Sequence, residues 1–216
     1  MKVYKFIDTN FGISNIALKR LKVTRLKDLN DPFELLAANV LNPKDRKALC
    51  EFKTQLHGTN GIVCFSGSWS NPLLWGHYAN NHNGMALGFE IPDQLIHKAH
   101  YTSQRVKVSF DQKTRKVVDA DILVDRLIRT KFTDWSYEDE YRIFIELADL
   151  NEEYGNYFLD FSPTLQLREV IVGMNCDLSI DRIRKLLDNE LTKVHVRKAR
   201  MAYRTFKMVE DRLFRK

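Results

Sequence analysis

The sequence has few cysteines and no long hydrophobic run, and each shortage excludes a class of protein. Cys50, Cys64 and Cys176 are the only cysteines among 216 residues, and they form no C-x-x-C pair. With no signal peptide ahead of them, this odd and widely spaced set favours a reducing cytoplasm over a disulfide-stabilised secreted protein. The longest apolar runs, such as GIVCF and EVIVGM, are far shorter than the roughly 20 residues of a membrane-spanning helix. We therefore expect a cytoplasmic protein without a membrane segment.

Glycine and proline are also scarce, with 9 and 5 residues, and no stretch rich in Gly, Ser or Pro separates two parts of the chain. Hydrophobic residues make up 44% and charged residues 29% of the sequence, a balance typical of globular proteins rather than disordered ones. A chain of this length can fill one hydrophobic core. We expect residues 1–216 to form a single domain.

Several motifs of nucleotide and metal chemistry are missing. The sequence contains no Walker loop, no G-x-G-x-x-G turn, no cysteine-histidine zinc cluster and no G-x-S-x-G elbow. His77 and His82 are five residues apart, which fits one helical face poorly, and no third ligand stands near them. We expect no bound metal.

Hydrophobic periodicity and capping residues predict a mixture of strands and helices without regular β-α-β alternation. Strands are predicted over 3–7, 61–66, 84–91, 105–110, 140–147, 156–161, 168–173, 193–199 and 203–209. Helices are predicted over 14–21, 42–58, 71–82, 119–132 and 179–190, with Ser14, Asn42 and Ser179 as candidate N-caps. This order indicates an α+β domain with a mixed, largely antiparallel or split β-sheet flanked by helices.

Positive charge gathers near the C-terminus. The chain has a net charge of +6, and basic residues far outnumber Glu210 and Asp211 beyond residue 192. Such a segment can attract RNA, DNA or another polyanion, although a solvated surface is the simpler interpretation. The residues predicted to contact nucleic acid are Lys193, Arg197, Arg200 and Arg204.

The stretch KFTDWSYEDEYRIFIEL, residues 131–147, places two carboxylates at the start of a predicted strand. Alternate side chains of an extended chain share a face, so Glu138, Glu140 and Arg142 should point the same way. Tyr137 and Tyr141 beside them offer the mixture of apolar body and polar tip that ligand clefts use. The stretch is therefore either a site or a polar strand edge.

Three longer phrases identify a family resemblance: LNDPFE at 29–34, VCFSGSWSNPLLWGHYANNHNGMALGFE at 63–90, and WSYEDEYRIF at 135–144. Their Asn-Asp-Pro-Phe, Cys-Phe-Ser, Trp-x-x-Tyr-Ala-x-x-His-x-Gly and Glu-x-Glu-Tyr-Arg elements resemble the signature of an uncharacterised domain family of bacterial and phage-linked genes. Order and spacing fit from about Tyr4 to Gly173. The family name carries no established activity.

A more distant resemblance carries chemistry. The order of an N-terminal strand with an aromatic or basic residue, a strand running into Ser-x-Ser and a strand opened by Glu-x-Glu resembles mono-ADP-ribosyltransferases. Those enzymes usually present Arg or His on the first strand, where this chain has Tyr4 and Lys5. The resemblance implies NAD as a substrate, without a metal. The matching residues are Tyr4, Lys5, Ser66, Ser68, Glu138 and Glu140.

The same resemblance assigns the two carboxylates different roles. Glu140 would stabilise the positive charge that develops on the ribose as nicotinamide departs, because a fixed negative group favours that state. Glu138 would orient the acceptor. The alternative for both is a solvated strand start.

Further residues are candidates for the NAD site, each with a structural alternative. Arg142 could hold the pyrophosphate through its forked donors or simply pair with Glu140. Tyr78 could stack on nicotinamide, whereas Trp75, three residues earlier on the predicted helix, could equally be core. His82 would close that helix and could bond ligand or backbone. Asn30 and Asp31 are candidate cleft residues, and Ser66 and Ser68 could form a turn instead of a rim.

Three classes of function remain open. The first is an NAD-dependent ADP-ribosyltransferase acting on RNA, DNA or protein, as a toxin or anti-phage effector that an antitoxin or regulatory protein could restrain. The second is a non-catalytic module that binds nucleic acid or protein through its basic end, without need of Glu140. The third is a hydrolase of a nucleotide-derived small molecule that uses the two carboxylates as acid and base. The clustering of distinctive residues in three separated segments favours the first.

Overall fold

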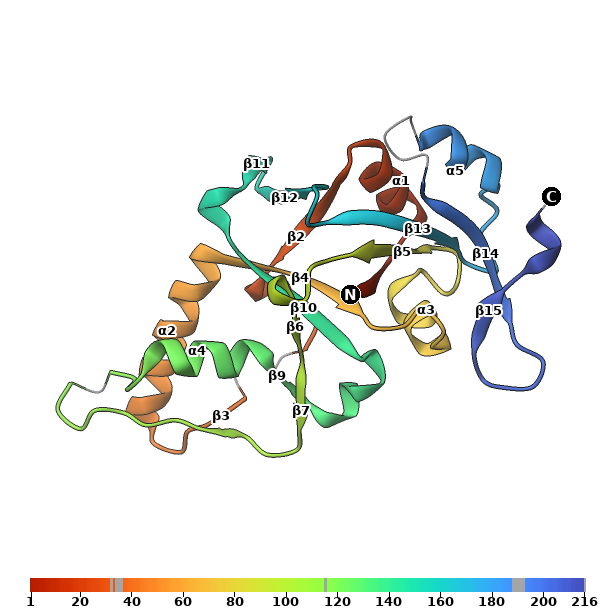
Figure 1. The fold of residues 1–216 in the computed structure, drawn as a ribbon. Helices are drawn as coiled ribbons and strands as arrows, with labels where there is room; N and C mark the ends of the chain where they lie inside the picture. Colours follow the sequence, from red (N-terminus) through yellow and green to blue (C-terminus); the bar gives the residue numbers. More distant parts are fainter. Residues whose placement is uncertain (32, 34–36, 115, 188–192, 216) are drawn as a thin grey trace.

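A large β-sheet forms the centre of the protein (Figure 1). The computed structural model describes residues 1–31, 33, 37–114, 116–187 and 193–215. The central sheet runs in the order β11-β12-β2-β4-β1-β5-β13-β14-β15, with β10 paired to β4 and β6 to β10. Its strands are β1 (Lys2–Ile7), β2 (Arg20–Arg25), β4 (Asn60–Ser66), β5 (Met85–Glu90), β6 (His97–Lys98), β10 (Glu140–Glu146), β11 (Asn151–Glu153), β12 (Asn156–Asp160), β13 (Gln166–Val172), β14 (His195–Met201) and β15 (Met208–Glu210).

Antiparallel pairing dominates this sheet, with β13 and β14 as its parallel pair. Two short parallel ladders stand apart: β3 (Ala38–Asn39) with β8 (Val106–Lys107), and β7 (His100–Thr102) with β9 (Thr130–Phe132). The predicted α+β class with a mixed, largely antiparallel sheet is confirmed.

Among the described residues, the α-helices that flank the sheet are α1 (Thr9–Ala17), α2 (Pro43–Thr59), α3 (Pro72–Tyr78), α4 (Ala120–Arg129) and α5 (Ile180–Leu186). Short 3₁₀ helices are η1 (Leu26–Asp28), η2 (Asp93–Leu95), η3 (Thr133–Glu138), η4 (Leu147–Asp149) and η6 (Arg212–Arg215). Asn42, Asn71 and Ser179 accept a hydrogen bond from a backbone N–H in the first turn of α2, α3 and α5, respectively. In the described part of the chain, no helix is both long and apolar enough to cross a membrane.

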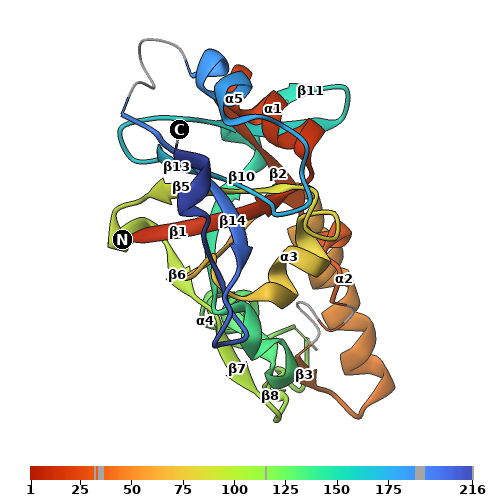
Figure 2. The same ribbon diagram turned by 90° about the vertical axis from the view of Figure 1, so that its right-hand side faces the viewer.

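The alternation of side chains along the strands divides the core into layers. Val3, Leu87 and Val170 pack in one cluster with Ile16 of α1 and Ile183 of α5. Their strand neighbours Tyr4, Ala86 and Ile171 point to the opposite face and pack with Trp75 and Ala79 at α3. A third cluster joins α2 and α4 below β4 through Leu49, Leu123, Leu127 and Ile62. Figure 2 shows α3 on the side of the sheet opposite α1, beside the β14–β15 hairpin that ends the sheet.

Some predicted elements differ from the structure. Asp8, not Ser14, caps α1. The helix predicted over 14–21 ends at Ala17, and its last two residues, Arg20 and Leu21, begin strand β2, in which Leu21 and Val23 face the core. The predicted helix over 119–132 ends at Arg129 and gives way to β9, and the predicted strand over 203–209 is extended only from Met208. Pro32, Glu34 and the end of the predicted 179–190 helix lie outside the described residues.

Strand β4 decides where the sheet splits. One edge of β4 pairs with β10 along its whole length, from Asn60 opposite Glu146 to Ser66 opposite Glu140. The other edge is shared, since β1 pairs at the Ser66 end and β2 at the Ile62 end. Between these two contacts the backbones of β1 and β2 diverge, and a cleft opens there.

Candidate active site

The cleft has a volume of about 260 Å³, which is near the lower limit of small-molecule sites. Apolar and aromatic side chains line it together with carboxylates, lysines and amides. Its lining residues are Tyr4, Lys5, Phe6, Thr24, Asp28, Leu29, Asn30, Cys64, Phe65, Ser66, Leu74, Tyr78, Lys131, Glu138 and Glu140. Seven of the residues singled out in the sequence lie there: Tyr4, Lys5, Asn30, Ser66, Tyr78, Glu138 and Glu140.

Three of these residues form one row across neighbouring strands. Tyr4 of β1 lies opposite Ser66 of β4, and Ser66 lies opposite Glu140 of β10. Residues that face each other across antiparallel strands point to the same side of a sheet. Segments more than 130 residues apart in the sequence therefore present a tyrosine, a serine and a carboxylate in one line beside the cleft.

The turns that carry the serine and the carboxylates pack against each other. The 3₁₀ helix η3 ends at Glu138, Asp139 adopts a left-handed conformation with φ of 43°, and β10 begins at Glu140. Gly67 donates its backbone N–H to the Asp139 carbonyl at 2.9 Å. A Cβ on Gly67 would lie 2.2 Å from Oδ2 of Asp139, so a larger residue here would require the Asp139 side chain to move.

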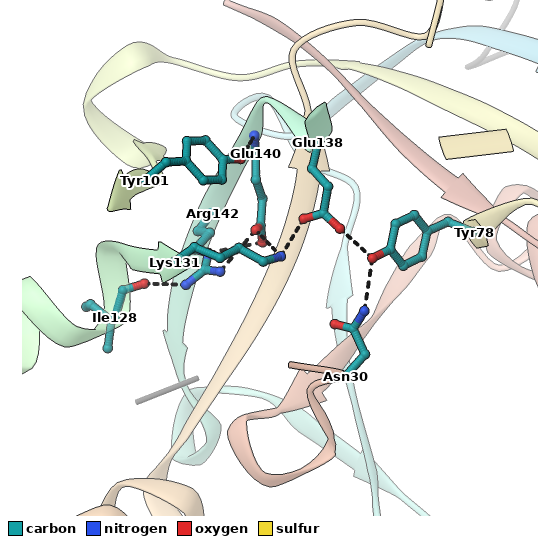
Figure 3. A network of polar contacts seen from close by, with 8 residues as sticks. All are labelled: Asn30, Tyr78, Tyr101, Ile128, Lys131, Glu138, Glu140 and Arg142. Carbon is teal, nitrogen blue, oxygen red and sulfur yellow. Dashed lines mark hydrogen bonds and ion pairs between the residues drawn. The ribbon is translucent and has the colours of Figure 1, made fainter. Parts of the chain in front are cut away.

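Buried ion pairs hold the two carboxylates together (Figure 3). The Lys131 ammonium donates to Oε2 of Glu140 at 2.7 Å and also to Glu138. Arg142 donates from Nε to one Glu140 oxygen and from Nη2 to the other, both at 3.0 Å, and from Nη1 to the Ile128 carbonyl at 2.6 Å. All four charged side chains are buried, so their attraction is poorly screened by water.

The two carboxyl groups differ in acidity. Burial alone would raise the pKa of Glu140, but Arg142 and Lys131 outweigh burial and hold that pKa at about 2. Burial raises the pKa of Glu138 above its ordinary value, and the bonds from Lys131 and Tyr78 offset only part of this effect. Burial opposes the charge of Lys131, yet the two carboxylates raise its pKa above the ordinary value. Glu140 is thus ionised at neutral pH, and Glu138 binds a proton more readily than Glu140 does.

Tyr78 extends this network to the far wall of the cleft. Its hydroxyl donates to Glu138 and accepts from Nδ2 of Asn30 at 2.9 Å. Burial and the Glu138 carboxylate raise the pKa of Tyr78 above its ordinary value. The phenol remains a donor to Glu138, and Asn30 fixes its orientation.

Tyr101 and Lys5 support the site from two sides. The Tyr101 hydroxyl accepts the Glu140 backbone N–H at 2.8 Å and so holds the first residue of β10 in place. Lys5 reaches into the split between the strands, where its ammonium lies 3.4 Å from the Cys64 carbonyl. Burial lowers the pKa of Lys5.

A second buried carboxylate lies on the other side of Tyr4. Glu169 of β13 accepts bonds from Lys2 at 2.7 Å and from Arg197 at 3.0 Å, and the Tyr4 hydroxyl lies 3.4 Å away. Burial and Glu169 together raise the pKa of Tyr4 to about 12. Glu169 therefore positions the first-strand tyrosine, a role that no sequence motif indicated.

Four predicted site residues do not line the cleft. Arg142 is 1% exposed, and its guanidinium donates to the Glu140 carboxylate and the Ile128 carbonyl. It therefore positions Glu140 and does not face the cleft, where a pyrophosphate would bind. Ser68 forms a turn with Ser70, their hydroxyls 2.9 Å apart. Trp75 is fully buried in the core and donates to the Trp69 carbonyl, since α3 turns that face onto the sheet. His82, in the left-handed turn after α3, lies parallel to the Trp75 ring with centroids 6.4 Å apart.

The other predicted residues are Asp31 and the four basic residues expected to contact nucleic acid. Asp31 is buried, caps a turn by accepting from the Phe33 N–H at 2.9 Å, and lines a neighbouring cavity. Of the predicted nucleic-acid contacts, Arg197 is bound to Glu169, whereas Lys193 and Arg204 are exposed. Arg200 lies at the C-terminal hairpin, where it donates to the Met201 carbonyl at 2.8 Å.

The most important omission was Lys131. The predicted helix over 119–132 placed it at an unremarkable helix end, but the strand β9 directs it between Glu138 and Glu140. The sequence contains one indication of this role: two neighbouring carboxylates need a cation if they are buried, and Lys131 is the first residue of the stretch 131–147 that carries them. No local pattern pointed to Glu169 or Tyr101.

The fold and cleft together define an α+β protein with a split antiparallel sheet and a buried carboxylate pair at the split. A family model described as "Protein of unknown function (DUF2971)" matches residues 74–143. The matched third of the chain carries Tyr78, Lys131, Glu138, Glu140 and Arg142, while Tyr4 and Ser66 lie outside it. Neither a curated protein nor a solved structure matches the sequence.

Proposed function

We propose that the protein is an enzyme that cleaves the nicotinamide–ribose bond of NAD and transfers the ADP-ribose to a macromolecule. The observation that carries the proposal is the row of Tyr4, Ser66 and Glu140 across three adjacent strands, which is the placement that the resemblance to mono-ADP-ribosyltransferases implies for its three motifs. Sequence order alone could not bring these residues together.

Glu140 suits the stabilisation of a cationic ribosyl group. When the nicotinamide nitrogen leaves with the bonding electron pair, positive charge develops on the ribose, and a fixed anion nearby lowers the energy of that state. The low pKa of Glu140 keeps it ionised at every physiological pH. Arg142 and Tyr101 hold the side chain and backbone of this residue, so no reorganisation is needed during the reaction.

Glu138 suits the proton transfer that completes the reaction. The acceptor oxygen or nitrogen forms a bond to the ribose carbon and releases one proton, which an ionised Glu138 can take. A raised pKa makes this carboxylate a better proton acceptor than Glu140. Water in place of the macromolecule would give NAD hydrolysis by the same steps.

The remaining cleft residues fit the parts of NAD. Tyr78, Phe6 and Leu74 supply apolar walls for a flat ring. Two lysines line the cleft. Lys131 is bound between the two carboxylates, whereas the Lys5 ammonium lies near the Cys64 carbonyl, so we assign the pyrophosphate to Lys5 in place of Arg142. The cleft volume matches the nicotinamide riboside half, which leaves the adenosine half outside the enclosed part.

The experiment measures nicotinamide release from NAD and ADP-ribose attached to mixed RNA, denatured DNA or protein. Glu138→Gln should reduce transfer by about 100-fold or more, because the proton acceptor is lost. Its amide can still bond Tyr78, and Lys131 keeps Glu140 as a partner, so the fold should persist. Transfer by the wild type should also rise with pH through one ionisation above pH 4.5, the ordinary pKa of the carboxyl.

Glu146→Gln is the matched control, since Glu146 is an exposed carboxylate at the far end of the same strand. It should retain wild-type activity. A wild-type protein that neither binds nor cleaves NAD with any of these acceptors would refute the proposal.

A further inference from the structure

The β14–β15 hairpin exposes two aromatic rings at its tip. Tyr203 is 92% and Phe206 99% exposed, although rings of this size are normally buried at least in part. The backbone beneath them is ordered by pairing, since Ala202 donates to the Lys207 carbonyl at 2.9 Å and Met201 lies opposite Met208. The rings therefore project from a firm support.

Cations surround these rings. Arg200, Arg204 and Lys207 line the same groove, against one carboxylate, Asp211. The Arg200 guanidinium carbon lies 4.9 Å from the centre of the Tyr203 ring. The groove is thus positive and carries stacking surfaces at intervals along a short chain segment.

The hairpin is attached to the loop that bears the cleft serine. Met208 donates its backbone N–H to the Ser70 carbonyl at 2.8 Å, and the Ser68 and Ser70 hydroxyls are 2.9 Å apart. Ser66 in turn donates its hydroxyl to the Ser68 carbonyl at 3.1 Å. Figure 2 shows the hairpin descending beside α3, the helix that follows this loop.

We infer that the hairpin from Arg200 to Lys207 binds single-stranded nucleic acid and presents it as the acceptor to the neighbouring cleft. This inference rests on the proposed transfer of ADP-ribose. Arginine and lysine neutralise phosphates, and exposed rings stack on unpaired bases of any sequence. A protein partner would leave the excess of cations unused unless it were acidic, so the combination favours a nucleic acid.

The inference changes the residues first expected from the basic C-terminal sequence. Arg200 and Arg204 remain, while Arg197 is committed to Glu169 and Lys193 lies before β14, away from the rings. Tyr203, Phe206 and Lys207 are added. Their exposure, which only the folded hairpin shows, distinguishes a stacking surface from a charged tail.

The test measures anisotropy of labelled single-stranded RNA and DNA oligonucleotides of about 12 nucleotides, within the usual site size for such surfaces. Tyr203→Ala and Phe206→Ala should each weaken binding by about 5-fold to 100-fold, the range for loss of one stacked base. Arg204→Gln should lower the slope of log affinity against log salt by about 0.7, the value for one phosphate contact on a single strand. Comparing the RNA and DNA arms identifies the preferred sugar.

Tyr154→Ala provides the matched control, because Tyr154 is a fully exposed tyrosine in the β11–β12 turn, distant from the hairpin (Figure 1). It should bind as the wild type does. The inference would be overturned if the wild type bound neither oligonucleotide. It would also be overturned if Tyr203→Ala and Phe206→Ala bound the oligonucleotides as tightly as the wild type does.

A second readout separates this inference from the proposed enzyme activity. Phe206→Ala should retain nicotinamide release to water, while its transfer to an oligonucleotide kept below saturation should fall by the same factor as its binding. Oligonucleotide binding that depends on both rings, without nicotinamide release by any variant, would support the hairpin surface and refute the enzyme. Nicotinamide release and transfer that are both unaffected by Phe206→Ala would refute the hairpin as the acceptor surface.

Discussion

Two buried carboxylates, Glu140 on β10 and Glu169 on β13, lie on either side of β1, and each is bound by two cations. The partners of Glu140 are themselves buried, with Lys131 4% and Arg142 1% exposed. The partners of Glu169 reach solvent, with Lys2 47% and Arg197 29% exposed. Water can replace part of the lost interaction around Glu169 but almost none around Glu140.

This difference indicates what each carboxylate contributes. Glu169 orients Tyr4, and because its cations Lys2 and Arg197 reach solvent, replacing Glu169 should cost little stability. A carboxylate enclosed with its cations beside a cleft is expensive to bury, and the low dielectric around it strengthens its effect on a charge developing nearby. The arrangement at Glu140 is therefore the one expected of a site.

The largest expected effect comes from neutralising the two carboxylates in turn. Glu140→Gln should lower the free energy of unfolding by about 3–5 kcal/mol, because the Arg142 charge stays buried without its counter-ion. Glu169→Gln should lower it by only about 1–2 kcal/mol, since Lys2 and Arg197 can be hydrated. Urea unfolding of both variants and the wild type measures the difference. Equal losses would show that the exposure of the cations does not matter.

Acid should remove the contribution of Glu140 over a defined pH range. Its pKa in the fold, about 2, lies below the ordinary 4.5, so the stability it provides is complete above pH 4.5 and is lost as pH falls through 2. The loss should approach about 3 kcal/mol, from 1.36 kcal/mol per pKa unit.

The wild type and Glu140→Gln should therefore converge in unfolding free energy between pH 4.5 and 2. Both proteins retain Glu138, whose raised pKa favours the folded state as pH falls, so the comparison reduces this opposite effect. Acid unfolding curves that stay parallel over this range would contradict the ion pairing assigned to Glu140.

The smallest effect is expected at the solvent-exposed end of the Glu169 cluster. Lys2→Ala should change the free energy of unfolding by less than about 1 kcal/mol, because the ammonium is half exposed and Arg197 still binds the carboxylate. Thermal unfolding at low and high salt measures it. A loss as large as that of Glu140→Gln would make the two clusters equivalent.

The local elements were predictable because their signals lie within a few residues. Asn42 followed by Pro43 predicted the start of α2, and the apolar run GIVCFS predicted the buried strand β4. Glu138 and Glu140 stood out because two carboxylates beside aromatic residues are unusual at a strand start. The boundary between α1 and β2 was wrong because Leu21 fits two patterns: it lies three residues after Leu18, a helical spacing, and it alternates with Val23, as in a strand with one buried face.

The site as a whole was not predictable from any one segment. The sequence by itself determined the α+β class, the main strands and the presence of a carboxylate pair, since these depend on the periodicity and chemistry of neighbouring residues. Only the tertiary structure decided that Tyr4, Ser66 and Glu140 stand in register, that Lys131 lies between the carboxylates and that Trp75 and Arg142 are buried. Cross-strand pairing joins residues far apart in the chain, and local preferences carry no information about which strands will pair or how deeply a side chain will lie.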